Sequence, residues 1–360
     1  MTAANSWRGR RVLITGHTGF KGAWLSFWLR GKGAEVFGYS LDPPTEPSLF
    51  RIAGIGELIA SDIRADIRNP SALKEALVQA RPEIVFHMAA QSIVRLSYSI
   101  PVETFSVNVM GTAHVLDAIR HVPSVRAAVI VTSDKCYENF GGARPYREID
   151  PMGGNDPYSA SKGCAELVVA SFRASASALD PQGSDIAVAS VRSGNVVGGG
   201  DWSPDRLVPD CIRSFIEGIP VKLRNPQAVR PWLHVLEPLA GYIEVAERLL
   251  GAEAKQYATA FNFGPAPIND ANVLEVAQAV ARLWGNRARV EIVGGGNLPE
   301  AEMLRLDSTK ALQLLGWKPR WKLTETLERA VEWYKAWQRG HDIRQLMTRQ
   351  LEAFGAKSTA

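Results

Sequence analysis

The sequence predicts an α/β protein: a Rossmann-type, doubly wound parallel sheet followed by a smaller C-terminal α/β portion. Short β-rich apolar runs alternate with helical patterns through the first half of the chain, and a glycine-rich turn follows the first of these runs. After about Gly194 the alternation breaks and glycine and proline become frequent. Regular alternation of strand and helix places parallel strands side by side and helices on both faces of the sheet.

The strands are predicted from runs too short for helices and rich in β-branched residues, as buried parallel strands are. They lie at Val12–Ile14, Val36–Tyr39, Ile84–His87, Ala127–Val131 and Ile186–Val191. Helical patterns separate them at Ala23–Arg30, Ser71–Gln79 and Thr104–His121, and a further helix begins near Tyr158.

The loss of regular strand–helix alternation after about Gly194 divides the chain into two expected domains. Residues 1–193 form the dinucleotide-binding domain, and residues 194–355 form mainly a substrate-binding domain, some of whose segments can return to the first sheet. Helices of the second part are predicted at Arg206–Glu217, Leu236–Leu250, Ala271–Leu283 and Leu323–Gln338.

Composition narrows the class of protein. A chain of 360 residues with 46% hydrophobic and 22% charged residues is an ordinary globular protein of one large or two fused domains. The net charge of +4 is scattered, which argues against a nucleic-acid partner. No apolar run is long enough to span a membrane, and the first ten residues lack an apolar signal core. Three cysteines at no metal-like spacing favour a reducing cytoplasm and no metal site.

The glycine-rich turn predicts a dinucleotide site. Gly16, Gly19 and Gly22 have the spacing G-x-x-G-x-x-G and connect the first strand to the first helix. Glycines there allow a tight turn and let the backbone approach a pyrophosphate, which the helix N-terminus then binds. We expect Thr18 and Phe20, within the same turn, to contribute to this cofactor site.

The adenosine end of the cofactor should lie beyond the second strand. That strand runs into Ser40, Asp42 follows two positions later, and no arginine occurs at the junction, which favours NAD over NADP. Asp62 and Ile63, after the third strand, are predicted neighbours of the adenine. Ala89, Ala90 and Gln91, after the strand at Ile84–His87, are predicted to lie near the nicotinamide.

Tyr158 and Lys162 form the predicted catalytic pair. They are one helical turn apart and therefore share a face. A nearby ammonium lowers the pKa of a phenol, which otherwise lies near ~10, and makes it a better proton acceptor. Thr132 or Ser133, at the end of the fifth strand, offers a hydroxyl that can bond both the tyrosine and a substrate alcohol.

Taken together, these motifs resemble the extended short-chain dehydrogenase/reductase family, and within it the nucleotide-sugar 4,6-dehydratases, over nearly the whole chain. The glycine turn and the tyrosine motif are shared across that superfamily. Narrower signals carry the resemblance to the dehydratases: the runs 132–137 (T-S-D-K-C-Y), 192–202 (R-S-G-N-V-V-G-G-G-D-W) and 230–235 (R-P-W-L-H-V).

The resemblance implies a reaction in which Tyr158 takes a proton from the hexose 4-hydroxyl while NAD accepts hydride from C4. Water is then eliminated across C5 and C6, and hydride returns to C6. Asp134 is the implied acid for the 6-hydroxyl. Most such dehydratases have Asp-Glu here, whereas this chain has Asp134 followed by Lys135. Our hypothesis is that Lys135 is the C5 base, its pKa lowered by burial and by Lys162; a bound water or Tyr137 is the alternative.

The resemblance also implies a sugar-nucleotide substrate, with CDP-glucose favoured, and a homodimer or dimer of dimers paired through the helices at Thr104–His121 and after Tyr158. Asn195, Arg224 and Arg230 are candidate substrate contacts, because amides and guanidinium groups suit sugar hydroxyls and phosphates. Ser133 is a fourth candidate.

Two other readings remain open from the sequence. An epimerase, or a dehydratase for a GDP-, dTDP- or UDP-linked hexose, would share the fold and the tyrosine pair, but Asp134 and Lys135 would be idle in an epimerase. An NAD-sensing regulatory protein would share the fold without catalysis, and such proteins usually lose the tyrosine or the lysine, both of which this chain keeps.

Overall fold

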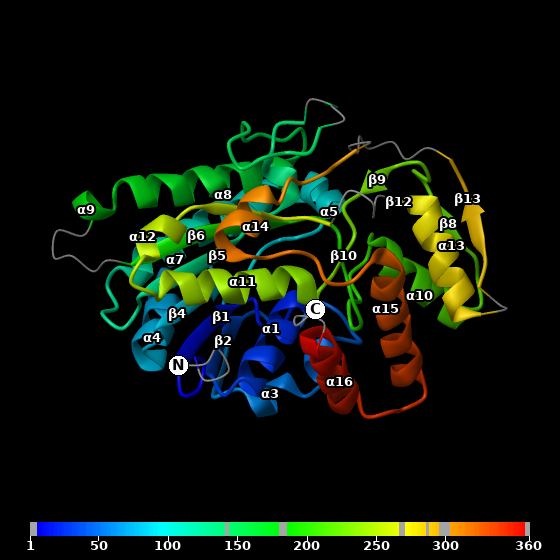
Figure 1. The fold of residues 1–360 in the computed structure, drawn as a ribbon, viewed down its shortest axis with the longest axis horizontal. Coiled ribbons are helices and arrows are strands. Elements are labelled where there is room, and N and C mark those ends of the chain that lie inside the picture. The colour runs from blue at the N-terminus through cyan, green and yellow to red at the C-terminus, as the bar shows by residue number, and fades with distance from the viewer. Residues whose placement is uncertain are drawn as a thin grey trace.

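A seven-stranded parallel sheet forms the centre of the protein and confirms the predicted doubly wound fold (Figure 1). The computed structural model describes residues 6–139, 141, 144–179, 186–265, 271–285, 288–294 and 303–356. The strand order is β11-β6-β5-β4-β1-β2-β3. The strands are β1 (Arg11–Thr15), β2 (Glu35–Ser40), β3 (Ser61–Arg64), β4 (Ile84–His87), β5 (Ala127–Val131), β6 (Ala187–Ser193) and β11 (Ala260–Phe263).

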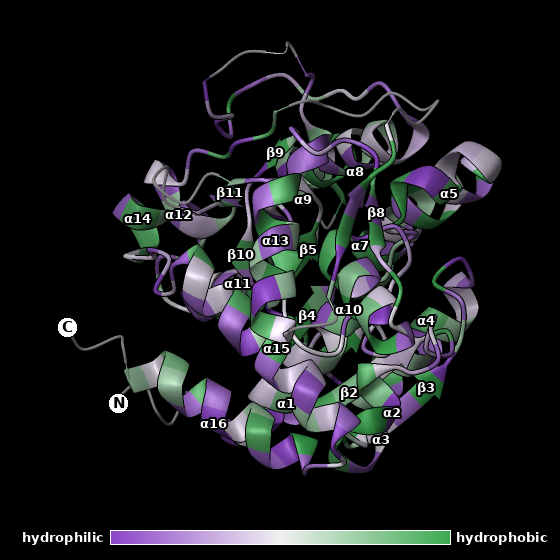
Figure 2. Ribbon diagram, turned by 90° about the vertical axis from the view of Figure 1, so that its right-hand side faces the viewer, coloured by the Kyte–Doolittle hydropathy of each residue, from purple (hydrophilic) through white to green (hydrophobic). Residues whose placement is uncertain are grey.

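Helices cover both faces because successive strand residues point to opposite sides. In β1, Leu13 packs into the cluster beneath α4 (Pro70–Ala80), α7 (Gly111–Ile119) and α8 (Pro157–Ala174). Its neighbours Val12 and Ile14 pack into the larger cluster with α1 (Phe20–Gly31) and α11 (Leu236–Leu249). In Figure 2 the buried strands β4 and β5 are hydrophobic, whereas helices such as α13 and α15 carry both colours, as amphipathic helices do.

Two local expectations were wrong. The helix predicted at Thr104–His121 begins earlier and is interrupted by a π-helical turn, because it comprises α6 (Pro101–Phe105), η2 (Ser106–Met110) and α7. Asp62 and Ile63 lie within β3 and not after it, since β3 pairs with β2 through Gly38 and Tyr39. Ile63 packs half-buried against the α4 and α7 face.

The C-terminal portion packs beside the carboxyl end of the sheet. Its helices include α10 (Leu207–Glu217), α13 (Val273–Trp284) and α15 (Leu323–Gln338), which lie close to where they were expected. The strand β11 returns to the main sheet beside β6, so the chain crosses between the two parts more than once. Residue 193 is therefore not a simple boundary between two domains along the chain. The division into a cofactor-binding and a substrate-binding domain stays a prediction.

The remaining elements complete the fold, and none of the helices within the described ranges is both long and apolar enough to cross a bilayer. They are α2 (Leu49–Ile52), α3 (Ile55–Leu58), α5 (Val94–Ser99), η3 (Asp134–Cys136), α9 (Ala176–Leu179), β7 (Val196–Val197), β8 (Val221–Leu223), β9 (Val229–Arg230), β10 (Leu233–His234), α12 (Ala254–Tyr257), β12 (Ala271–Asn272), β13 (Val290–Ile292), α14 (Thr309–Leu315) and α16 (Ile343–Ala356).

Candidate active site

A cavity of about 250 Å³ lies at the carboxyl ends of the central strands, where open α/β sheets bind ligands. Residues following β4, β5 and β6 line it, together with the start of α1 and segments of the C-terminal portion. Tyr158 and Lys162 reach it from α8, and Asp134 and Lys135 from the turn after β5. The sequence-predicted catalytic groups therefore converge on one cavity.

The helix α8 begins where its sequence predicts, because Asp156 caps it and Pro157 occupies its first turn. Lys162 is buried and its Nζ lies 3.5 Å from the Val131 carbonyl oxygen. Burial lowers the pKa of Lys162 to about 8, although Glu166 opposes this shift. The same burial raises the pKa of Tyr158 to about 12, against a hydrogen bond with Ser133 that lowers it. The lowered pKa expected for Tyr158 is thus wrong for the resting protein.

The hydroxyl beside Tyr158 belongs to Ser133 and not to Thr132. The Thr132 Oγ1 donates to Glu166 Oε1 at 2.5 Å, which fixes this hydroxyl on the interior carboxylate. Ser133 hydrogen-bonds the phenol and also donates to Asp134 Oδ1 at 3.0 Å. Thr132 also lines the cavity, but its hydroxyl is engaged by Glu166, so of the two hydroxyls the structure favours Ser133, and the catalytic role of Thr132 stays a prediction.

The acid and amine side chains stand on the short turn η3, which Ser133 caps. Asp134 is 3% exposed, and its Oδ2 has no hydrogen-bond partner in the described part of the chain. Burial raises the pKa of Asp134, while the positive charge of Lys135 opposes the shift. Lys135 is half-buried in the cavity wall. An unpaired, buried carboxyl of this kind is suited to hold a proton and to donate it to a ligand.

Tyr137, the alternative base, is excluded by its position. Its hydroxyl donates to Asn262 Oδ1 at 2.7 Å and accepts from Arg192 Nη1 at 2.6 Å. Burial raises the pKa of this phenol well above its ordinary value. Tyr137 is buried, is absent from the wall of the main cavity and lines a smaller cavity that Lys135 also borders.

The glycine turn has the shape of a phosphate cradle. Gly16 has φ +75°, and a Cβ there would lie 2.7 Å from the Ala89 backbone nitrogen. A Cβ on Gly22 would lie 2.2 Å from the Gly16 carbonyl oxygen, so α1 packs closely under the turn. Gly19 precedes α1 with no side-chain cap, Phe20 opens the helix, and its first turn contains no acidic residue. The turn therefore leaves backbone N–H groups and a positive helix end for an anion.

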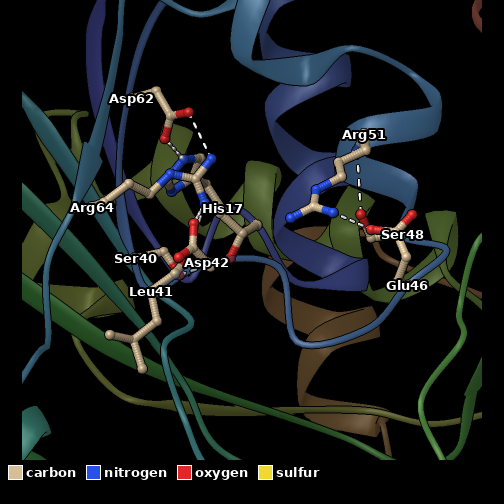
Figure 3. Close-up of polar contacts among 10 residues, drawn as sticks. His17, Ser40, Leu41, Asp42, Glu46, Ser48, Arg51, Asp62 and Arg64 are labelled. Carbon is tan, nitrogen blue, oxygen red and sulfur yellow. Dashed lines mark hydrogen bonds and ion pairs between the residues drawn. The ribbon is translucent and has the colours of Figure 1, made fainter.

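The adenosine end differs from its expected chemistry (Figure 3). Thr18 Oγ1 lies 2.9 Å from Ser40 Oγ, which ties the glycine turn to the end of β2. An arginine does stand at this junction: Arg64, from β3, donates to the Leu41 carbonyl at 3.2 Å. Its charge is opposed by Asp62 at 2.7 Å and by Asp42 at 3.6 Å. The two carboxylates disfavour a ribose phosphate. The preference for NAD over NADP therefore rests on these carboxylates and not on the absence of an arginine.

The segment after β4 lies against the glycine turn. Ala89 N donates to Thr15 Oγ1 at 3.2 Å, and Ala90 lines the cavity. Gln91 is fixed on both sides, because its backbone N–H donates to Asn108 Oδ1 at 2.9 Å and its amide donates to Thr104 Oγ1 at 3.0 Å. These residues are placed where a cofactor in the glycine turn would pass, and their roles stay predictions.

Of the predicted substrate contacts, Asn195 and Arg230 line the cavity and Arg224 does not. Arg224 instead contacts Asp205, which is itself a residue of the cavity wall, at 3.1 Å. Three cations of the cavity wall were missed: Lys21, from the first turn of α1, Arg95, from α5, and Arg206, which pairs with Asp201 at 3.0 Å. The lysine inside the glycine motif was a visible signal for the first. No sequence signal marks Arg206.

A parallel α/β sheet, a glycine turn for a dinucleotide and a Tyr-x-x-x-Lys pair with a neighbouring hydroxyl define an extended short-chain dehydrogenase/reductase. A family model described as GDP-mannose 4,6 dehydratase matches residues 13–330, and the chain belongs to this family of sugar-nucleotide enzymes. It is 49% identical to the CDP-glucose 4,6-dehydratase of Salmonella typhimurium over 360 residues, which cover all of both chains. It is 25% identical to a dTDP-glucose 4,6-dehydratase of Xanthomonas campestris, over 89% of this chain and 92% of that relative.

Solved structures with this fold include enzymes of two activities. A dTDP-glucose 4,6-dehydratase of Streptomyces venezuelae, solved with NAD bound, superposes with a TM-score of 0.77 at 22% identity, over 93% of this chain and 99% of that one. A UDP-glucose 4-epimerase of Stenotrophomonas maltophila superposes with a TM-score of 0.78 at 24% identity, over 92% of this chain and 99% of that one. At these identities the likeness establishes the fold.

Proposed function

We propose that this protein is a lyase that converts CDP-glucose to CDP-4-keto-6-deoxyglucose and water. The observation that carries the proposal is the convergence of the Tyr158–Lys162 pair and the Asp134–Lys135 turn on one cavity. An epimerase of this fold needs only the first pair. Identity of 49% with a CDP-glucose 4,6-dehydratase along the full chain supports both the reaction and the nucleotide.

At Gly16 and Gly22 the backbone is packed so closely that a Cβ would overlap neighbouring backbone atoms. The turn therefore carries no side chains at these two positions and fits the pyrophosphate of NAD. Gly16, Gly19 and Gly22 would hold the diphosphate through backbone N–H groups, Thr18 and Asp62 would lie toward the adenosine, and Ala89–Gln91 toward the nicotinamide. Bound NAD would supply a two-electron acceptor that takes hydride from C4 of the sugar and returns it at C6.

Oxidation at C4 requires Tyr158 to take the proton of the 4-hydroxyl. Ser133 positions the phenol and can bond the same substrate oxygen. The high pKa of Tyr158 in the resting protein means that positive charge must be added near it before it loses its proton. Lys162, on the same face of α8, supplies a part of that charge when protonated.

Elimination then uses the turn η3. The C4 ketone acidifies the proton at C5, which Lys135 in its amine form would take; the electron pair forms the C5–C6 double bond as the C6–O bond breaks. Asp134 donates the proton that converts the departing hydroxyl to water. Its buried Oδ2 and raised pKa keep this proton in place until the sugar arrives.

Arg230 and Asn195 would contact the diphosphate and the sugar from the opposite wall. Arg230 is 5% exposed, so its guanidinium is pre-positioned and its charge is poorly screened by solvent. Arg224 lies behind Asp205 of the cavity wall and pairs with it, so its charge is already used by that carboxylate.

Exposed apolar side chains gather on α6, η2 and α8, which supports the proposal that the protein forms a homodimer through these helices. Val102 is 81% exposed, Met110 50% and Leu167 60%. Such residues are costly to leave in water when they lie together.

We also propose that the protein works in the cytoplasm, because Cys136, Cys164 and Cys211 are all free thiols.

Mass spectrometry of reactions with NAD and CDP-, dTDP-, GDP- or UDP-hexoses tests the proposal. We expect loss of one water from CDP-glucose without net NADH. Water loss from another nucleotide sugar would overturn the specificity and keep the reaction. An unchanged mass with altered stereochemistry would identify an epimerase, and no reaction at all would favour a regulatory protein.

A further inference from the structure

A buried polar cluster lies directly behind the turn that carries Asp134 and Lys135. At its centre Glu166, from α8, and Arg192, from β6, form a two-pronged ion pair. The Arg192 Nε lies 2.9 Å from Oε1 and Nη2 lies 2.7 Å from Oε2. The two side chains are only 2% and 4% exposed. Ser190 donates a further hydrogen bond to Oε2 at 2.8 Å.

Each member of this pair also reaches one end of the acid/amine turn. Glu166 accepts the Thr132 hydroxyl at 2.5 Å, and Thr132 is two residues before Asp134. Arg192 donates to the Tyr137 hydroxyl at 2.6 Å, and Tyr137 is two residues after Lys135. The Arg192 guanidinium also lies over the Tyr137 ring at 4.9 Å. The two residues that bracket the turn are thus joined through one buried ion pair.

Stability alone is a weak explanation for this arrangement. A buried ion pair loses most of its Coulomb energy to desolvation, and apolar residues of the same volume often serve as well. Burial raises the pKa of Glu166, but the hydrogen bonds and charge of Arg192 outweigh it and leave the pKa below its ordinary value. What the pair provides is fixed geometry, because a guanidinium and a carboxylate that bond through two atoms each cannot rotate independently.

We propose that the Glu166–Arg192 pair is a positioning device for the elimination step, which holds Asp134 and Lys135 in register with C6 and C5 of the sugar by fixing Thr132 and Tyr137. The inference rests on the proposed dehydratase reaction. Tyr158 and Lys162 stand on α8, whereas both the acid and the amine stand on the turn, so elimination depends more on the turn than oxidation does. Oxidation shares only Ser133, the cap of the turn. Loosening the turn should therefore slow elimination more than C4 oxidation.

The Tyr137→Phe variant tests this with the loss of one hydroxyl. It cuts the link to Arg192 but keeps the ring, which stacks on Tyr146 with centroids 5.1 Å apart. Tyr146→Phe is the matched control, since it removes a hydroxyl from the adjacent ring that bonds Asn139 at 3.0 Å. In single turnovers with CDP-glucose, we expect Tyr137→Phe to form NADH at a rate within about twofold of the unaltered enzyme. We expect it to eliminate water about tenfold more slowly, since small misplacements of reacting groups carry penalties of this size or more.

NADH absorbance should then rise and persist in Tyr137→Phe. In the unaltered enzyme and in Tyr146→Phe it should not persist. Thr132→Val removes the hydrogen bond at the other end of the turn and should likewise slow elimination more than oxidation. This second variant keeps the inference testable if Tyr137→Phe does not fold. Equal slowing of oxidation and elimination in the folded variants, or an unchanged partition in both, would overturn it. If the unaltered enzyme itself releases no water from CDP-glucose, the proposed function fails and the positioning role falls with it, whereas unchanged rates in the variants beside a working unaltered enzyme overturn the positioning role alone.

Discussion

Replacing Asp134 with asparagine tests the assignment of the acid with an almost isosteric change. Asparagine keeps the acceptor oxygen that bonds Ser133 at 3.0 Å, but it has no proton to give the departing 6-hydroxyl. The oxidation half of the reaction does not use this group. Asp134→Asn should therefore oxidise C4 at nearly the normal rate and stall before water leaves, so that NADH accumulates.

The size of the effect follows from what a positioned acid contributes. General acid catalysis is worth about 10²–10⁴-fold, which corresponds to roughly 3–5 kcal/mol on the barrier at about 1.4 kcal/mol for each factor of ten. Because Asp134 is buried and its Oδ2 bonds nothing else in the described chain, no neighbouring group is placed to replace it. The loss in elimination rate should lie in the upper part of that range.

Stability gives an independent readout of the same carboxyl. Burial raises the pKa of Asp134 above its ordinary 3.8, so ionisation is easier in the unfolded chain than in the folded one. Its contribution to stability is complete below pH 3.8 and is lost as the pH rises through the raised value. Asp134→Asn should thus melt at a higher temperature than the unaltered protein at pH 8, and the advantage should vanish in acid. A variant that eliminates water normally, or that melts lower at pH 8, would refute the assignment.

Three further substitutions, one of them with a control at Arg224, probe the rest of the cavity. Gly22→Ala should abolish NAD binding in a fluorescence titration while circular dichroism stays native, because its Cβ would lie 2.2 Å from the Gly16 carbonyl oxygen. Arg230→Met should raise KM for CDP-glucose about 10- to 100-fold with a smaller change in kcat, as loss of a charge-assisted bond worth ~1.5–3 kcal/mol predicts, whereas Arg224→Met should change KM less than threefold. Lys135→Met should stop solvent deuterium from entering C5, as seen by mass spectrometry; wash-in at the normal rate would remove Lys135 as the base.

The features that sequence predicts well are those encoded locally. The strands β4 and β5 were placed to the residue because short apolar runs end at polar breaks, and Tyr158 and Lys162 face the same cavity because their spacing equals one helical turn. The glycine turn was found for the same reason, since its spacing is fixed by contacts within a single strand–helix junction.

Features that depend on packing between distant segments were missed. Thr132 and Ser133 are chemically alike, and only the position of Glu166 on α8 decides which hydroxyl faces inward. Arg64 reaches the end of β2 from the neighbouring strand, so a search at the junction itself could not find it. The pKa of Tyr158 depends on how completely the fold buries it, which spacing does not reveal.

Crowding of cations in the cavity leads to a last expectation about ligand binding. Burial lowers the pKa of Lys21 to about 7 and that of Lys162 to about 8, and the two charges repel each other. A bound diphosphate would favour both ammonium forms and raise these values. Below pH 6 both lysines already carry their protons, so binding takes up few; at pH 8 Lys21 is mostly neutral and Lys162 about half charged, so binding should draw protons from solution.

Calorimetric titration with CDP, which binds without reacting, measures this uptake in two buffers of different ionisation enthalpy. At pH 8 the apparent binding enthalpy should differ between HEPES and Tris, and the corresponding difference between cacodylate and bis-Tris at pH 6 should be smaller. Lys21→Met should reduce the uptake at pH 8, whereas Lys32→Met, half-buried at the end of α1 and outside the cavity wall, should leave it unchanged. Identical enthalpies in both buffers at pH 8 would mean that the lysines in the cavity do not sense the diphosphate, and the substrate would then have to be held by Arg230 and its neighbours alone.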